Sequence, residues 1–515
     1  MHRACGPRAA RRRRSGIELS TPVIPPDPSR DKASASGAGA WRPWALAGGL
    51  ALVVGVASAV LAWAPWIAAG LVFGGALLAV TVIWPLPVVT VLLFLGPLDL
   101  AFLTGGFKGL FEQFGGLDMN GIRLVGVTAG LALLILGNRA EWGRIREAPV
   151  RWYAMFLVYA SLSLLVSGDP GEGLRLLFKL AWPLLIYLTV TAPQRTSAEI
   201  DRVVDWILVG ATILILINPF FVLGGNVVVE VSGDVRVGGA GIHQNPFSFY
   251  MLVIVLLSLG RFAGRAQIRY VLLALAAILW MALTLTRITL LAGLVALAAA
   301  GLYGSIARRQ YRPVVVSLGL ATVIAAALTP VVLTRTFGYI PGPGELIGLL
   351  TDPVALYGLI NWQGRELLWG VLVTAWMASP LVGLGLGSSS GILKSLFTRE
   401  MGTVAHNEYV RLGTDTGFLG IGLFFTAMMS WIRLIVTLKG GDDPRVQEVA
   451  LPALSVVLAW GVVSITDNAF DYYAPFTQYA GFLVGASVVT ARDLRQSGLR
   501  QSRPGQPEPA KSGIE

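Results

Sequence analysis

Long apolar runs constrain the fold of this chain more than any other feature of its sequence. Runs of about 17–22 residues recur between Trp44 and Ala491, separated by polar segments. This length matches the hydrocarbon core of a bilayer. Lipid supplies no hydrogen-bond partners, so only helices and closed barrels cross it, and barrel strands alternate over about ten residues. The sequence therefore predicts an all-α polytopic integral membrane protein.

About 12–14 transmembrane helices are expected, since Pro65 alone separates the first two of the fourteen apolar runs. The predicted spans are 44–63, 66–84, 86–103, 120–137, 151–167, 173–192, 203–223, 247–262, 267–285, 288–306, 313–334, 409–437, 448–466 and 476–491. They divide the chain into five parts. A basic tail covers 1–43, helices 1–11 cover 44–334, a large loop covers 335–408, helices 12–14 cover 409–491, and a second tail covers 492–515.

Charge decides the orientation of these spans. Only 13% of the residues are charged, against roughly 25% in soluble proteins, and the net charge is +11. With the N-terminus in the cytoplasm, 28 of the 40 Lys and Arg residues fall in loops on that side, as the positive-inside rule requires. Topology thus accounts for the basic balance without nucleic acid. We expect disordered cytoplasmic tails, an inner (cytoplasmic) membrane location, and an extracytoplasmic 335–408 loop.

The remaining cations on the outer side need a separate explanation. Arg175, Lys179, Arg287 and Arg411 lie inside or at the edge of spans, where charge is costly. They could form buried ion pairs with acids at the same level or reach the interface, or they could bind an anionic ligand. The span centres contain almost no charge, which argues against a proton-coupled transporter.

Two short polar clusters lie on the outer side of the predicted membrane. The first runs from Asp234 to Pro246 and supplies Arg236, His243 and Asn245 among glycines that permit close backbone approach. It could equally be a re-entrant turn capped by Asn245. The second is Thr284–Thr289, where Arg287 stands between two apolar runs. A guanidinium there suits a lipid pyrophosphate, or it could reach the head groups.

The third cluster is the large loop itself. Residues 363–378 predict an interfacial helix with Arg365 in its first turn, ended by Pro380. A cation does not suit a helix N-terminus, so Arg365 points to a role other than helix stability. His406 directly precedes a long span, and a neutral imidazole there could remove a proton from a sugar hydroxyl. The alternative is a structural histidine at a helix start.

The sequence also lacks several motifs. It contains no phosphate-binding Walker A sequence, so ATP is not expected to supply energy. The run Gly383-Leu-Gly385-Leu-Gly387 lacks the strand and helix of a nucleotide site. Outside the tails there are two histidines and no cysteine, so neither a metal site nor a cofactor is expected.

In order, spacing and sidedness these motifs resemble the O-antigen ligase and O-antigen polymerase superfamily of polytopic glycosyltransferases, over roughly residues 120–490. The resemblance rests on six features of the sequence: Arg236 to Pro246, Thr286-Arg287, Gly364-Arg365 to Trp369, Pro380 to Gly385, His406-Asn407, and Gly417 to Gly420. Fourteen spans exceed the usual twelve or so, and Thr286 replaces the commoner serine, so the subfamily stays open.

The resemblance implies a GT-C-like, metal-independent inverting glycosyltransferase that uses a glycan on undecaprenyl pyrophosphate. Arg287 and Arg365 would hold the pyrophosphate, and His406 would act as base on the acceptor hydroxyl. Asn407 or Glu408 would orient the base or the substrate, with Arg236 and His243 as further contacts. The acceptor would be a sugar or a lipid-linked glycan. Ligase and polymerase are not separated, and two other hypotheses remain: a lipid-glycan flippase or transporter, and a non-catalytic scaffold.

Overall fold

The computed structural model describes residues 65–96, 126–133, 143–224, 227–229, 235–239, 244–308, 341–352, 365–397, 404–438 and 443–501, with the single residues 137, 319, 329 and 333. By its contacts the chain divides after Ala51, and all of these residues belong to the unit Leu52–Glu515. The predicted tail 1–43, the predicted span 44–63 and most of 313–334 lie outside the described residues.

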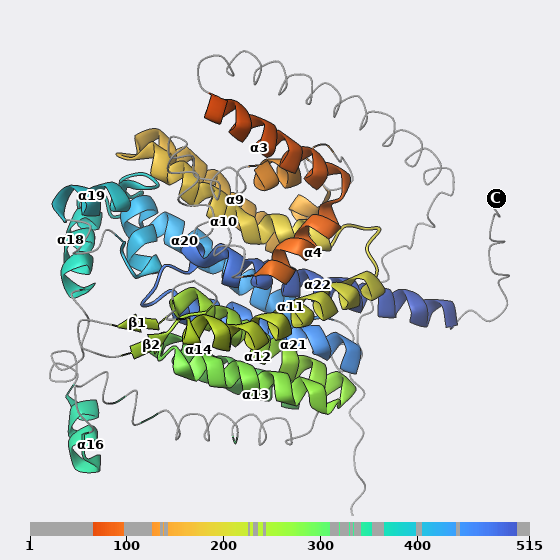
Figure 1. Cartoon of the computed structure of the whole chain (residues 1–515). Helices are drawn as coiled ribbons and strands as arrows, with labels where there is room; N and C mark the ends of the chain where they lie inside the picture. The colour runs from red at the N-terminus through yellow and green to blue at the C-terminus, as the bar shows by residue number, and fades with distance from the viewer. Residues whose placement is uncertain are drawn as a thin grey trace, which may run out of the picture. The chain divides into compact units, whose positions relative to one another are not determined.

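The described chain is helical apart from one small hairpin (Figure 1). The α-helices are α3 (Pro65–Ile83), α4 (Pro85–Leu95), α9 (Ala148–Ser163), α10 (Pro170–Val190), α11 (Ser197–Leu223), α12 (Gln244–Arg265), α13 (Ile268–Leu283), α14 (Arg287–Arg308), α16 (Pro343–Thr351), α18 (Arg365–Ala378), α19 (Ser388–Leu396), α20 (Glu408–Val436), α21 (Pro444–Val463) and α22 (Gln478–Gln501). The antiparallel hairpin pairs β1 (Val227–Val229) with β2 (Val235–Val237). Short 3₁₀ and π turns cover Gly143–Arg146, Leu164–Val166, Ala469–Tyr472 and Tyr473–Thr477.

Seven of the described helices are long and apolar enough to cross a membrane. They are α10, α11, α12, α14, α20, α21, and α9 together with the turn that follows it. The segments Val72–Ile83 and Pro85–Leu95 form a pair bent by 114°, which could supply an eighth span. Two separate spans were expected at 66–84 and 86–103. The chain is therefore built like a multi-pass membrane protein. The bend at Trp84 lies where the boundary between the two spans was expected.

Helix α12 lies at the centre of the fold. Every residue from Gln244 to Ser258 is buried, and α12 packs against α13, α14 and α21 (Figure 1). A helix that is buried around its whole circumference presents no face to lipid or water. Beside it, α9 packs on α20 and α10 packs on α22. The core of these packed pairs includes the stacked rings of Tyr153 and Trp431, with centroids 5.2 Å apart.

Local signals in the sequence set where several helices begin. Asp169 caps α10 by accepting a hydrogen bond from the backbone N–H of Glu172 at 3.1 Å, and Pro170 occupies the first turn. Thr196 and Glu199 form a capping box at the start of α11. At the other end of the chain, α22 continues to Gln501, past the expected end at 491, and Asp493 on this extension accepts a hydrogen bond from the N–H of Ser197 at 2.6 Å.

Helix α20 is broken at Gly417, whose φ of 64° is not helical. A single rigid span was expected over 409–437. The backbone of the preceding loop fills the break: the N–H of Phe418 donates to the carbonyl of Pro380 at 2.9 Å, and the N–H of Leu384 donates to the carbonyl of Thr414 at 2.8 Å. The glycine-rich stretch therefore holds the first turns of α20 in place.

Charged groups gather at the two ends of the helices. At the C-terminal end of α12, the buried Arg261 contacts Asp201 at 2.7 Å and Glu448 at 2.6 Å. Asp201, Arg261 and Glu448 lie in or next to loops that the Lys and Arg count assigned to the cytoplasmic side. These residues meet at the C-terminal end of α12. The N-terminal end of α12, at Asn245, contacts Asp467, which follows α21. This second end contains several of the predicted site residues, among them His406 and Arg365.

Candidate functional site

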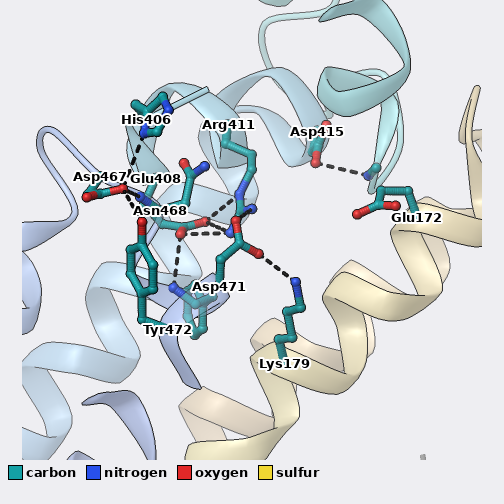
Figure 2. A network of polar contacts seen from close by, with 12 residues as sticks. Glu172, Lys179, His406, Glu408, Arg411, Asp415, Asp467, Asn468, Asp471 and Tyr472 are labelled. Carbon is teal, nitrogen blue, oxygen red and sulfur yellow. Dashed lines mark hydrogen bonds and ion pairs between the residues drawn. The ribbon is translucent and has the colours of Figure 1, made fainter. Parts of the chain in front are cut away.

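His406 precedes α20, which begins at Glu408, and contacts the segment that follows α21. Its Nδ1 lies 3.4 Å from Oδ1 of Asp467 (Figure 2). The histidine side chain is 31% exposed, whereas Asp467 is 1% exposed. The buried carboxylate can orient the accessible ring through Nδ1, which leaves Nε2 for another partner.

Asp467 is itself held by three further donors. Asn245, on α12, donates from Nδ2 to Oδ2 of Asp467 at 2.8 Å. The Tyr472 hydroxyl donates to Oδ1 at 3.1 Å, and the backbone N–H of Asn468 donates at 2.9 Å. Burial, together with the adjacent Asp467 carboxylate, raises the pKa of Tyr472 well above its usual range, so the phenol keeps the proton that it donates. A carboxylate with this many donors is fixed in position.

The contact through Asn245 extends to the turn between α13 and α14. The Thr286 hydroxyl lies 3.5 Å from Oδ1 of Asn245. Arg287 follows Thr286 directly and is the first residue of α14. The Thr-Arg pair singled out in the sequence therefore lies beside the residues that orient His406. Asn245, which could have been the cap of a turn, lies inside α12 and serves this network.

Arg365 reaches the same place from the large loop. It is the first residue of α18, where a helix was expected over 363–378. Its Nη1 donates to the carbonyl of Thr466 at 2.9 Å, one residue before Asp467. The indole N–H of Trp369, one turn further along α18, donates to the carbonyl of Ala405 at 2.8 Å. Helix α18 is thus tied to both sides of the His406–Asp467 contact.

A second charged network lies next to the first (Figure 2). Arg411 donates from Nε and Nη2 to the two oxygens of Glu408, each at 2.8 Å, and from Nη1 to Asp471 at 2.8 Å. Lys179 on α10 donates to the other oxygen of Asp471 at 2.7 Å. Burial alone would raise the pKa of Asp471, but Arg411 and Lys179 outweigh it and hold that pKa well below its usual range. For Lys179 and Arg411, the ion-pair explanation describes what the structure shows.

Asn407 and Glu408 form the start of α20. Asn407 is the N-cap of α20, and its side-chain oxygen accepts from the N–H of Val410 at 3.0 Å. Glu408 is fully buried, and it accepts from Arg411 and from the N–H of Phe470 at 3.2 Å. His406 itself has a φ of 48°, in the left-handed region. The loop therefore turns sharply at the histidine before the capped helix begins.

A cavity of about 60 Å³ is lined in part by the Arg411–Asp471 network. Arg411, Asp415, Asn468 and Asp471 are among the residues that line it. The Asn468 side chain is 1% exposed, and within the described part of the chain neither its oxygen nor its nitrogen has a hydrogen-bond partner. A buried amide without a partner is costly. A cavity of this size next to it can hold one or two waters or a hydroxyl group.

Two predicted residues are not placed at the site. His243 lies outside the described residues. Arg236 lies in β2, where its backbone pairs with Val228, and its side chain is outside the description. In the sequence, Asp467 and Asp471 are identified only as two of the acids at the level of the outer cations. A stronger signal was available, because Asp467-Asn468 and Asp471-Tyr472 form a polar run between two apolar spans.

Among the residues that the structure describes, no three His, Cys, Asp or Glu side chains are grouped so that they could hold a metal ion. No protein-family model matches this chain, and the search of curated proteins found no match either.

Proposed function

We propose that this protein is a glycosyltransferase of the O-antigen ligase and polymerase type. It takes a glycan from undecaprenyl pyrophosphate and transfers it to an acceptor hydroxyl at the outer face of the cytoplasmic membrane. In this proposal the chain has 12–14 spans, cytoplasmic termini and a site formed by the large outer loop together with the helix ends. The proposal rests on the sequence resemblance and on the geometry around Asp467.

One observation carries the proposal. Segments that are far apart in the sequence meet within hydrogen-bond distance: His406 contacts Asp467, Asn245 contacts the same carboxylate, and Arg365 contacts the residue before it. Thr286, which touches Asn245, places the start of α14 there as well. A candidate base and cationic side chains at one helix end are the parts that transfer from a pyrophosphate requires.

In the proposed reaction Nε2 of His406 removes the proton of the acceptor hydroxyl while that oxygen attacks the anomeric carbon of the donor sugar. A new C–O bond forms, and the bond from the anomeric carbon to the pyrophosphate oxygen breaks with inversion. The electron pair leaves with undecaprenyl pyrophosphate. Asp467 keeps the imidazole in orientation and stabilises the imidazolium that forms. The energy comes from the activated lipid.

Arg287 and Arg365 would stabilise the charge on the leaving pyrophosphate. Arg365 donates one described hydrogen bond, to the carbonyl of Thr466, and a guanidinium has five N–H groups in a planar fork. The remaining donors can bind phosphate oxygens while the first keeps the side chain in place. Ligase and polymerase differ in the acceptor, which this chemistry leaves open.

The test is transfer from purified lipid-linked donor by the full-length protein. His406→Asn should lower kcat by about 10²–10⁴, because asparagine tolerates the left-handed backbone but cannot accept the proton. Arg287→Ala and Arg365→Ala should weaken donor binding and slow transfer. Arg175→Gln is the matched control: its side chain is 62% exposed and contacts only Glu172, at 3.6 Å, among described ion pairs.

Two results would overturn the proposal. One is normal transfer by His406→Asn at matched expression and melting temperature. The other is a wild-type protein that moves the lipid-linked glycan across vesicles without forming any glycosidic product, which would favour a flippase.

A further inference from the structure

Helices α4 and α11 pack against each other (Figure 1). Residues of both helices line a groove that shares no residue with the candidate site. Its volume is about 600 Å³, within the range of small-molecule sites. Its walls are apolar and include Leu86, Val91 and Phe94 from α4 and Trp206 from α11. Glu199, Arg195 and Arg202 also line it, near the start of α11. One cavity thus combines hydrocarbon walls with cationic groups.

Close packing further along the two helices accounts for the position of the groove. At Gly210 the helices approach so closely that a Cβ atom would lie 2.3 Å from the carbonyl oxygen of Phe94. The rings of Phe94 and Trp206 meet edge to face, with centroids 5.9 Å apart. The groove occupies the preceding part of α11, between this contact and Arg195.

The cations of the groove exceed its acids. Glu199 accepts from the N–H of Thr196 at 2.9 Å and lies 3.6 Å from Arg195. The Nε of Arg195 is buried and has no hydrogen-bond partner within the described residues. The exposed Arg202 donates from Nε to the carbonyl of Ala198 at 3.4 Å, and it has no ion pair in the described part of the chain. The described lining of the groove therefore holds two guanidinium groups and one carboxylate, and that carboxylate already has partners.

The groove belongs to the helix end opposite His406. The start of α11 contacts Asp493, and Asp201, one helical turn beyond its first residues, contacts Arg261 at the C-terminal end of α12. Trp206 lies one helical turn past Arg202 and is 55% exposed. Along α11 an arginine is therefore followed by a tryptophan and then by apolar residues. Membrane helices show the same order from the head groups into the hydrocarbon core.

We propose that this groove is a binding site for one anionic phospholipid. The phosphate lies between Arg195 and Arg202, and an acyl chain lies along Val91 and Phe94. Charge complementarity selects the head group, because basic pockets between helices bind anionic lipids. The apolar walls would also accept a zwitterionic lipid, but the cations favour a net negative head group.

The test counts phospholipids retained by the full-length protein in native mass spectrometry, after incubation with phosphatidylglycerol or phosphatidylcholine. Wild type should retain one phosphatidylglycerol in preference to phosphatidylcholine. Arg202→Gln should weaken retention about fivefold and Arg195→Gln/Arg202→Gln about tenfold or more, since each cation near a phosphate contributes on the order of 1 kcal/mol. Val91→Trp should abolish retention by filling the groove while leaving both cations.

Arg269→Gln is the control, because Arg269 is an exposed cation near the start of α13 that does not line the groove. It should retain lipid as wild type does. Arg202 is exposed, so its replacement leaves a folded protein, which size exclusion and melting temperature verify. Equal retention by wild type and Arg202→Gln, or equal retention of the two lipids by wild type, would overturn the proposal. So would loss of retention in Arg269→Gln.

Discussion

His406 and Asn407 are adjacent, but His406 turns the backbone and Asn407 caps α20. The left-handed φ of 48° at His406 turns the chain, and such a conformation is costly for most residues but tolerated by His and Asn. Asn407 then satisfies one of the backbone N–H groups that an α-helix leaves open at its start. The imidazole therefore has an orientation set by its own backbone, by the capped helix that follows, and by the Asp467 carboxylate.

Replacement of Asn407 separates its cap from any contact with substrate. Asn407→Ala should destabilise the protein by about 1 kcal/mol, because the N–H of Val410 loses its acceptor. Asn407→Asp keeps an N-cap oxygen and should melt at nearly the wild-type temperature. Melting of the purified variants and donor turnover check this. If Asn407→Asp melts normally but loses turnover, Asn407 also contacts substrate, and if it melts like Asn407→Ala, the cap explanation is wrong.

At the scale of elements, the break in α20 determines how the site is built. The segment before Gly417 contains Glu408, Arg411 and Asp415, and it packs against polar partners. Asp415 accepts from the N–H groups of Gly387 at 2.9 Å and Ser389 at 2.7 Å, at the start of α19. The break lets this segment leave the direction of the span, and the Pro380–Gly387 loop supplies the backbone partners that a continuous helix would have supplied.

Gly417→Ala should be strongly destabilising. A Cβ at this residue would lie 2.3 Å from the carbonyl oxygen of Leu381, on a backbone with φ of 64°. We expect a loss of about 2 kcal/mol or more, since strain and an unrelieved clash add. Donor turnover should fall as well, because the segment after His406 shifts.

The matched control is Gly422→Ala, in the same helix. A Cβ there meets nothing within 4 Å, and alanine in a helix interior is favoured over glycine by about 1 kcal/mol. This variant should melt at or above the wild-type temperature. Similar melting of the two alanine variants would show that the break at Gly417 has no structural importance.

On the scale of the whole molecule, ion pairs join helices that are distant in sequence. Asp471 joins Lys179 of α10 to Arg411 of α20, and Arg261 of α12 joins α11 to α21 at the other end. The Arg261–Glu448 pair is buried, so removing one member leaves the other uncompensated, at a cost of about 3 kcal/mol. These pairs fix which helices meet, whereas the apolar faces specify partners less strictly.

The lowered pKa of Asp471 predicts an acid-sensitive fold. The folded pKa lies below the unfolded value of about 3.9, so the folded state holds its proton less tightly. This stabilisation is complete above about pH 5 and is lost as pH falls through the unfolded value towards the folded one. Melting temperature measured from pH 6 to pH 3 should therefore fall.

Asp471→Asn should lower the melting temperature at pH 7 and flatten its fall in acid. Glu366→Gln, an exposed acid on α18, should keep the wild-type slope. An unchanged acid slope in Asp471→Asn would show that other carboxylates control the acid response.

The sequence by itself determined where most described helices lie. The spans expected at 203–223, 247–262 and 288–306 correspond to α11, α12 and α14, because a run of apolar residues long enough to cross a bilayer is a local property. Of the loop ends that the charge count assigned to one side, Asp201 and Glu448 meet at Arg261 in the described structure, while the sidedness of the other loops stays a prediction. The order of the motifs was the only sequence feature from which His406, Arg365 and the Thr286-Arg287 turn could be assigned to one site.

Tertiary structure alone decided the partners. Packing between segments distant in sequence selected Asp467 as the contact of His406 and Asp471 as the partner of Lys179. It also determined the bend between α3 and α4 and the break at Gly417. A glycine in an apolar run permits a break but does not require one, and a carboxylate between spans can pair with any nearby cation. Which of these occurs follows from the helices that pack around it.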